Sequence, residues 1–301
     1  MTSATAASPA NTREFLLGLI EPAVLLPWAA YHYAVVCLET VFKRGQLLKP
    51  LLRSREIRDE AFGRFWVDFS VRGDDQQLVD IDETQLQGSA ALVPPLLARA
   101  SGVVLDLGPG TGTQMPFLRS PAIRAIYGAE PCVGLHAQLR RRVLAAGLEG
   151  KYHIVPSGAE KEALLPALDK LGVTAASEGI FDTIICVRVL CSVPDPARTI
   201  ADLYSLLRPG GQMLIVEHVV NQWRPWKRRT KGSLLARLMQ ALYTALGWSF
   251  FMGDCHLDRD TTGYLIQAAE KDGGWASVDL EHRWEWSAMP YVSGVLVKKT
   301  T

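Results

Sequence analysis

The sequence has no CxxC pair, and its cysteines and histidines are nowhere grouped at the spacing of a zinc site. The five cysteines are odd in number and scattered along the chain, so no disulfide framework is indicated. We therefore expect no metal centre, and a reducing, cytoplasmic environment.

Net charge is also nearly absent. The 32 lysines and arginines balance 31 aspartates and glutamates, which leaves a formal charge of +1. A chain without a strong field of one sign is not expected to bind nucleic acid. Internal repeats are lacking, and the one biased tract is the beginning, which is rich in Ala, Ser and Thr. With 48% hydrophobic and 21% charged residues, the composition is that of a globular protein.

A long apolar run lies near the N-terminus. Residues 16–38 contain one formal charge, Glu21, and as a helix they would extend ~35 Å, enough for a bilayer core. Lys43, Arg44 and further basic residues follow, and such a flank would keep the remainder of the chain cytoplasmic. The residues before the run lack the basic character of a signal peptide. Two interpretations stay open: membrane attachment, spanning or interfacial, and a buried helix that covers the main domain.

A dense basic and aromatic patch runs from Trp223 to Lys231. Its tryptophans suit a membrane interface, and its cations suit anionic headgroups or an acidic substrate. The alternative is a solvated loop whose tryptophans fold back on the core. The patch and residues 16–38 are thus the candidate contacts with the cytosolic face of an internal membrane.

From residue 103 onward, short β-branched runs alternate with helical stretches. Strands are expected at residues 103–107, 125–129, 152–155, 183–187 and 213–216, and helices at residues 114–119, 135–146, 160–171 and 196–207. This alternation predicts right-handed βαβ units and a parallel sheet. The C-terminal runs "SVDLEHRWEW" and "YVSGVLVKK" are separated by a short turn, which predicts an antiparallel hairpin at the sheet edge.

The stretch "VVLDLGPGTG" places three glycines where the chain leaves the first expected strand. Without Cβ atoms, Gly108, Gly110 and Gly112 allow a sharp turn and close approach to a ligand. A dinucleotide turn reads GxGxxG, but Thr113 stands where the third glycine of that pattern belongs. The turn therefore favours a cofactor without a pyrophosphate. Asp106 precedes the turn and is placed to reach an ammonium group or, through water, the turn's backbone.

Glu130 ends the second expected strand in "IYGAEP", about 20 residues after the first glycine. An acid at that position accepts hydrogen bonds from both ribose hydroxyls of a bound nucleoside. The alternative is that Glu130 is a solvated acid at a strand end. The position of Glu130 relative to the glycine turn favours the ribose role.

Four stretches together resemble the class I S-adenosylmethionine-dependent methyltransferases: "LDLGPGTG", "GAEP", "FDTIICVRVLCSVPDP" and "LRPGGQMLIVEHV". The resemblance implies S-adenosylmethionine as cofactor. It also implies an α/β, Rossmann-like fold: a mostly parallel seven-stranded sheet with an antiparallel C-terminal hairpin, and an N-terminal helical extension. Residues 1–56 would be the tail and apolar segment. Residues 57–301 would be the methyltransferase domain, with lid helices at 57–100 and the core at 101–301.

Narrower motifs are "RDEAFGRFW", "VLCSV", "EHV", "GDCHLDRDT" and the ending "YVSGVLVKK". They resemble the methyltransferase-like alkyl thiol methyltransferases, whose members carry an N-terminal membrane-anchoring segment. That resemblance implies S-methylation of small lipophilic thiols at endoplasmic-reticulum or lipid-droplet membranes. Similar sequences occur among tailoring enzymes of microbial and fungal natural products, where N- or O-methylation is implied equally.

The resemblance assigns cofactor contacts residue by residue. The candidates are Asp106, Gly108, Pro109, Gly110, Thr111, Gly112, Glu130, Pro131, Gly158, Ala159, Glu160, Arg188 and Val189. The family often has an Asp that hydrogen-bonds the adenine amine, and Gly158 takes its position here. Adenine would then depend on the backbone of Gly158 and Ala159, or on Glu160.

Acceptor and base candidates follow from placement at the carboxyl ends of strands. His218 ends the fifth expected strand and is the candidate base, with a loop histidine that only makes a structural hydrogen bond as the alternative. Candidate substrate contacts are Cys191, Asp254, Cys255 and His256. Cys191 is expected to be a small buried residue rather than a nucleophile.

Two rival functions remain. A dehydrogenase is disfavoured by Thr113 in place of the third glycine. A non-catalytic adenosylmethionine-binding or membrane scaffold protein is disfavoured by the presence of Asp106, the three glycines and Glu130, whereas Gly158 leaves room for it.

Overall fold

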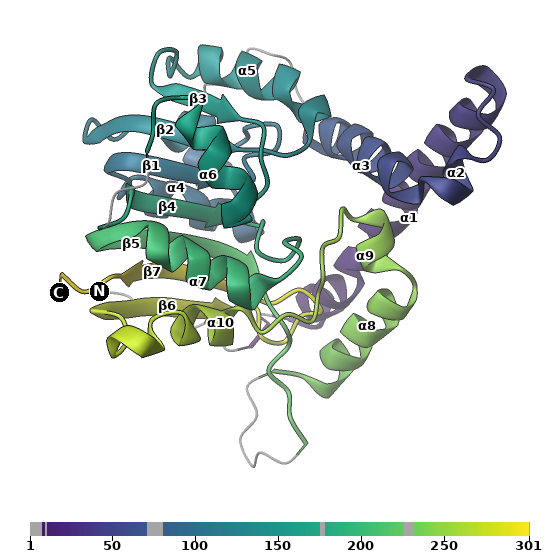
Figure 1. The fold of residues 1–301 in the computed structure, drawn as a ribbon. Helices are drawn as coiled ribbons and strands as arrows, with labels where there is room; N and C mark the ends of the chain where they lie inside the picture. Colours follow the sequence, from purple (N-terminus) through teal and green to yellow (C-terminus); the bar gives the residue numbers. More distant parts are fainter. Residues whose placement is uncertain (1–7, 10, 71–80, 175–177, 226–231, 301) are drawn as a thin grey trace. The chain divides into compact units, whose positions relative to one another are not determined.

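The computed structural model describes residues 8–9, 11–70, 81–174, 178–225 and 232–300 (Figure 1). The chain forms two compact units. The sheet unit comprises Ser70–Glu217, Thr261–Glu281 and Val292–Thr301; the helical unit comprises Met1–Phe69, His218–Asp260 and His282–Tyr291.

The sheet has seven strands in the order β3-β2-β1-β4-β5-β7-β6. Neighbours from β3 through β5 pair in parallel, which confirms the predicted parallel sheet, and the C-terminal strands form the expected antiparallel pair at its edge. The strands are β1 (Gly102–Leu107), β2 (Ile123–Ala129), β3 (Tyr152–Val155), β4 (Phe181–Val187), β5 (Leu207–His218), β6 (Ser277–Arg283) and β7 (Tyr291–Val297).

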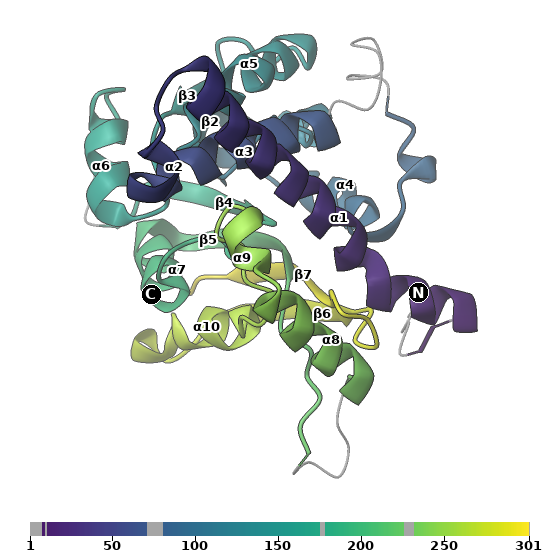
Figure 2. The same cartoon turned by 90° about the vertical axis from the view of Figure 1, so that its right-hand side faces the viewer.

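Helices cover both faces of the sheet, which explains why its central strands read as continuous apolar runs. Figures 1 and 2 show α6, α7 and α10 on one face and α4 on the other. The helices are α4 (Val93–Leu97), α5 (His136–Ala145), α6 (Lys161–Asp169), α7 (Pro196–Leu206) and α10 (Thr261–Gln267), with shorter turns η3 (Glu83–Gln85), η4 (Gly88–Leu92), η5 (Met115–Phe117), η6 (Val133–Leu135) and η7 (Glu270–Asp272). Asp195 caps α7 by accepting a hydrogen bond from the Arg198 amide.

The structure contradicts one helix that was predicted from the sequence. Residues 114–119 were expected to be helical, but they form only the single 3₁₀ turn η5, Met115–Phe117. Pro116 has no amide hydrogen to donate, and the side chains of Met115, Pro116 and Phe117 are all buried. The apolar side chains of this stretch are therefore buried in the core, and they do not form one face of a helix.

The helical unit contains α1 (Thr12–Leu38), η1 (Glu39–Lys43), α2 (Lys49–Leu52), most of α3 (Ser54–Ser70), α8 (Leu234–Ala245) and α9 (Trp248–Phe251). Asn11 caps α1 and Ser233 caps α8, each through a side-chain oxygen that accepts a backbone amide of the first turn. The boundary expected between residues 56 and 57 falls inside α3.

α1 is the one helix in the described part of the chain that is long and apolar enough to cross a membrane, by length and composition only. Two prolines lie inside it, Pro22 and Pro27. Pro22 has no amide to donate to the Gly18 carbonyl one turn earlier, and that carbonyl instead accepts the Ala288 amide at 3.0 Å. The proline thus frees a backbone oxygen that fastens α1 to the rest of the helical unit.

Candidate functional site

The glycine turn follows β1 in a backbone conformation that only glycine adopts easily. Gly108, Gly110 and Gly112 have φ angles of 57°, 60° and 83°. The side chain of Val189 occupies the space in which a Cβ on Gly108 would stand. The Pro109 carbonyl accepts the Gly112 amide at 2.9 Å and closes the turn.

Glu130 lies at the end of β2 with its carboxylate against this turn. Its Oε2 accepts the Gly110 amide at 2.9 Å, and its Oε1 accepts the Cys132 amide at 2.8 Å. Burial raises the pKa of Glu130, while these two amides oppose the rise. Each oxygen retains a second lone pair, so the carboxylate can also accept a pair of ribose hydroxyls. Pro131 follows it at the surface.

Asp106 is fully buried on β1, and its described hydrogen-bond partners are the side chains of Tyr152 and Gln114. Its expected contact with an ammonium group or, through water, with the turn backbone stays a prediction. The Tyr152 hydroxyl donates to Oδ2 at 2.8 Å, and Gln114 Nε2 donates to Oδ1 at 3.2 Å. Burial raises the pKa of Asp106 to about 6, although both hydrogen bonds favour the charged form. Asp106 therefore holds β1, β3 and the segment after the turn together.

Thr111, inside the turn, is held by a buried arginine of α5. Arg142 Nη1 donates to Thr111 Oγ1 at 2.8 Å, and Arg142 Nη2 donates to the Ser70 carbonyl at 2.8 Å. The Thr111 hydroxyl in turn donates to Ser70 Oγ at 2.9 Å. The guanidinium thus connects the glycine turn, α5 and the end of α3, because its fork of donors reaches several acceptors at once.

The remaining cofactor candidates follow β3 and β4. Gly158, Ala159 and Glu160 lie between β3 and α6, and a Cβ on Gly158 would meet the Glu160 carboxylate. Arg188 follows β4 with a φ of 56°, which is rare for a residue with a side chain. Parallel strands end at one edge of the sheet, so the segments after β1, β2, β3 and β4 meet there.

Glu217 is a site residue that the sequence analysis did not single out. It lies on β5, and its Oε1 accepts the amides of Val189 and Leu190 at 2.8 and 3.0 Å. One buried carboxylate therefore holds the segment that follows β4. Val189 of that segment packs against Gly108 of the glycine turn. The one sequence signal is an acid at the end of an apolar strand, in "LIVEHV".

A methyltransferase-domain family matches residues 83–273, which include every candidate cofactor-binding residue named above. The chain belongs to this methyltransferase family. S-adenosylmethionine is the cofactor that the family implies, and the residues present fit it. The turn is built from glycines without Cβ atoms, the Glu130 carboxylate beside it can accept further hydrogen bonds, and Thr113 stands where a dinucleotide turn has its last glycine.

Relatives of this methyltransferase differ in the atom they methylate. Human thiol S-methyltransferase TMT1B is 26% identical over 167 residues, 55% of this chain and 59% of that protein. A phosphatidylethanolamine N-methyltransferase of Cereibacter sphaeroides is 27% identical over 172 residues, 56% of this chain and 72% of that protein. The chain thus spans about three-fifths of the length of TMT1B.

Among solved structures, a possible exported protein of Bordetella parapertussis shares the fold. It has a TM-score of 0.50 and 14% identity over 90% of this chain and 97% of that one. This likeness concerns the fold alone.

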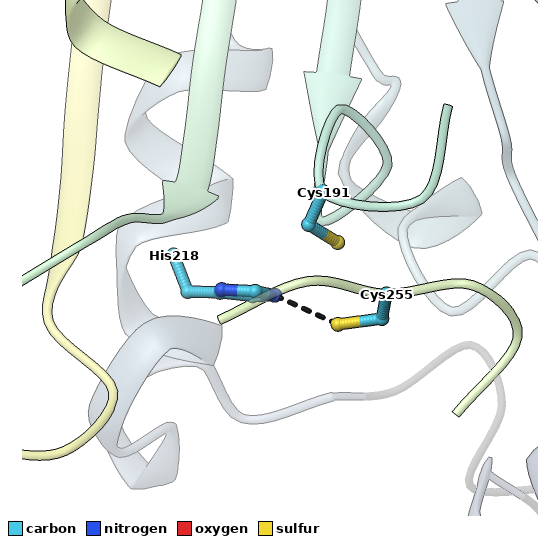
Figure 3. Close-up of side chains that lie close together, drawn as sticks. All are labelled: Cys191, His218 and Cys255. Atoms are coloured by element: carbon cyan, nitrogen blue, oxygen red, sulfur yellow. Dashed lines mark hydrogen bonds between the residues drawn. The ribbon is translucent and has the colours of Figure 1, made fainter. Parts of the chain in front are cut away.

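The acceptor candidates of the methyltransferase are divided between the two units. Cys191 belongs to the sheet unit, where it is buried in the segment after β4, with its Sγ 3.6 Å from Ser192 Oγ. The other candidates belong to the helical unit. There His218 Nε2 lies 3.1 Å from Cys255 Sγ, as Figure 3 shows, and the Trp248 indole donates to the same sulfur at 3.2 Å.

Asp254 and His256 flank Cys255 and have different surroundings. Asp254 has a φ of 58°, and its carboxylate accepts a hydrogen bond from Arg58, which also donates to the Phe250 carbonyl at 2.8 Å. Burial lowers the pKa of His256, and the positive charge of Arg259 adds to that effect. Asp254 is thus engaged with α3, and its contact with a substrate stays a prediction.

The basic and aromatic patch lies largely outside the described residues, which omit 226–231. Within the described part, the Trp223 amide donates to Asn221 Oδ1 at 3.1 Å.

Proposed function

We propose that this methyltransferase transfers a methyl group from S-adenosylmethionine to a small lipophilic acceptor, with a thiol as the first candidate. The observation that carries the proposal is the Glu130 carboxylate, hydrogen-bonded to Gly110 inside the glycine turn and still able to accept ribose hydroxyls.

The chain's own residues account for binding and positioning. When bound, S-adenosylmethionine supplies an electrophilic methyl group on a sulfonium with a neutral leaving group. Glu130 would orient the ribose, the backbone of Gly158 and Ala159 with Glu160 would face adenine, and the segment of Arg188 and Val189 would line the methionine end. A transfer of this kind needs alignment and exclusion of water more than covalent help from the protein.

A thiol acceptor is supported by chemistry and by relatedness. A thiol has a reference pKa near ~8.5 and needs little help to reach the nucleophilic thiolate, whereas an ammonium or hydroxyl needs more. TMT1B is named for thiol S-methylation. The phosphatidylethanolamine relative keeps N-methylation open, and O-methylation in natural-product biosynthesis remains the third possibility.

His218 is the proposed base for an acceptor that arrives protonated. The Trp248 indole N–H can only donate, so the Cys255 sulfur accepts from it and its own S–H can donate to the lone pair of His218 Nε2. Such a chain would orient the imidazole at the end of β5. To act as the base, Nε2 would exchange this hydrogen bond for the proton of the acceptor. Contacts of Cys191, Asp254, Cys255 and His256 with the acceptor are part of the same proposal.

The decisive experiment measures cofactor binding and turnover separately. Calorimetry with adenosylhomocysteine should show binding that Glu130→Ala weakens by about 100-fold, because a buried hydroxyl–carboxylate pair is lost. Glu162→Ala, at an exposed carboxylate on α6, is the matched control and should bind as the wild type does. Equal affinity of Glu130→Ala and wild type would contradict the ribose role.

Labelled S-adenosylmethionine with a panel of thiols, amines and phenols then identifies the acceptor. Methylation of lipophilic thiols ahead of the other two classes is expected. Tight cofactor binding without transfer to any member of the panel would favour the rival function, a non-catalytic adenosylmethionine-binding protein.

Association with a membrane on its cytosolic side is proposed as well. Its support is α1, which is long and apolar enough for a bilayer, followed by a basic segment. A lipophilic acceptor would be concentrated in the same membrane.

A further inference from the structure

We propose that the helical unit docks on an anionic lipid surface through the outer sides of α1 and α8 and through residues 42–52, and that α1 lies in the membrane plane instead of crossing it. This inference rests on the proposed membrane association, and it specifies which surface of the helical unit contacts the membrane and how α1 is oriented. Figure 2 shows α1, α2, α8 and α9 of this unit from one side.

The inner side of α1 is fastened to protein along nearly its whole length. Near its start, the Gly18 carbonyl accepts the Ala288 amide at 3.0 Å and the Leu19 carbonyl accepts the Tyr243 hydroxyl at 3.0 Å. In its middle and last third, Trp28 packs edge-on against Phe65, and Tyr33 packs edge-on against Phe250 and Phe251.

The end of α1 continues this packing, because Val36 is fully buried with Ile57 and Ala61 of α3. A helix that crosses a bilayer alone would have to give up all of these contacts. It would also carry the Gly18 carbonyl, which Pro22 leaves without a helical partner, into hydrocarbon. The packed side therefore argues against a spanning helix.

The outer side of α1 is apolar and exposed. Its residues recur three, four or seven positions apart, as one face of a helix requires, and include Leu16, Ile20, Val24, Tyr31 and Leu38 at 46–65% exposure. Arg13 and Glu14 lie in the first turn of α1, and beyond that turn its one formal charge is Glu21, at the margin of this stripe. Desolvation raises the pKa of Glu21, with nearby His218 opposing the rise, so its carboxyl is more easily neutral than a glutamate with an ordinary pKa.

α8 presents a second apolar face. Its inner residues Ala236, Gln240 and Tyr243 are buried, and its outer leucines are 47–56% exposed: Leu234, Leu235, Leu238, Leu242 and Leu246. A helix that faces water normally carries charged residues on its outer side, whereas here that side is apolar from end to end. α8 contacts α1, so the two faces belong to one surface of the unit.

The segment between α1 and α3 adds strongly exposed apolar side chains together with positive charge. Phe42, Leu47, Leu48, Leu51 and Leu52 are 63–80% exposed. Residues 43–55 include five cations, Lys43, Arg44, Lys49, Arg53 and Arg55, and no acid. Four of them form ion pairs with Glu39, Glu56 or Glu60, so five cations face three acids and the segment keeps a positive excess. Exposed leucines among cations match an interface of acyl chains and anionic headgroups, which favours lipid over a protein partner.

The first test determines topology. Full-length protein with a peptide tag at each terminus is added to preformed vesicles of phosphatidylcholine and phosphatidylserine, which are then floated and treated with protease from outside. If α1 lies in the plane, both tags are cleaved. Protection of one tag until detergent is added would mean that α1 spans, and would overturn the inference while leaving membrane association intact.

The second test maps the face. Leu238→Glu with Leu242→Glu on α8, and separately Leu48→Glu with Leu51→Glu, should each lower partitioning onto the vesicles by about tenfold or more. Leu144→Glu with Leu171→Glu changes two exposed leucines of the sheet unit and is the matched control. Adenosylhomocysteine binding by each variant reports that it is folded. Unchanged partitioning of the α8 variant would overturn its part in the surface.

Two further measurements test whether binding depends on anionic lipid and whether the surface instead binds a second copy of the protein. Arg53→Gln with Arg55→Gln should reduce binding to phosphatidylserine vesicles about tenfold and leave the weak binding to pure phosphatidylcholine unchanged. If wild-type protein does not float at all, the proposed membrane association itself fails. If it instead sediments as a dimer that the α8 variant dissociates, the surface binds a second copy and the lipid assignment is wrong.

Discussion

The Tyr152 hydroxyl of β3 reaches across β2 to donate a 2.8 Å hydrogen bond to the Asp106 carboxylate of β1. It can do so because Gly128, the β2 residue paired with Asp106, has no side chain: a Cβ there would meet the Tyr152 ring. Three adjacent strands are thus connected by one polar contact directly below the glycine turn.

Removing this contact should weaken both the fold and the cofactor site. Tyr152→Phe leaves one Asp106 oxygen without its donor and is expected to lower the free energy of unfolding by about 1–2 kcal/mol. Gly128→Ala displaces the ring as well and should cost more. Chemical denaturation measures both. Tyr127→Phe, on β2 with its ring against His153, is the control, and a loss as large as that of Tyr152→Phe would contradict the assignment.

Asp106 should make stability depend on pH. Its pKa is raised from 3.8 to about 6 in the folded chain, so the folded state binds more protons than the unfolded state between these values. Stability from this group is therefore complete below about pH 4 and falls as the pH rises through 6, by about 3 kcal/mol at most. Asp106→Asn should flatten the curve of unfolding free energy against pH over this range. An unchanged slope would show that Asp106 titrates normally.

Glu217 should act on the cofactor through the segment after β4. Glu217→Ala leaves the amides of Val189 and Leu190 without an acceptor and is expected to raise KM for S-adenosylmethionine about tenfold. Glu217→Gln keeps an acceptor oxygen and should recover most of the affinity. If Glu217 has only a structural role, both variants should have a lower melting temperature, and KM should not change independently of kcat. That result would contradict the positioning role.

The sheet could be predicted because its strands are buried on both faces. Runs such as "VVLDL" and "TIICV" are apolar without interruption, and the helical stretches between them are long enough for parallel crossovers. Residues 114–119 were mispredicted because apolar letters alone do not separate a helix from a buried 3₁₀ turn.

The site was predicted only where its residue types are unusual for their position. Three alternating glycines and an acid at a strand end are such signals, and they led to Gly110 and Glu130. Arg142 and Tyr152 gave none, because an arginine in a helix and a tyrosine in a strand are ordinary until their partners are known. Their roles depend on contacts between residues 31 and 46 positions apart.

The sequence by itself determined the sheet, the glycine turn and the acid beside it, because backbone preference and strand periodicity are local properties. Only the tertiary structure decided what Asp106 bonds to, that Glu217 holds the segment after β4, and that α1 is packed along one side. These depend on which distant side chains share a buried volume, and periodicity within one element carries no information about that. The same apolar letters of residues 16–38 suit a spanning helix and a helix lying in the membrane plane. They also suit a helix packed on protein, and the buried inner side of α1 supports the proposal that this helix does not span a bilayer.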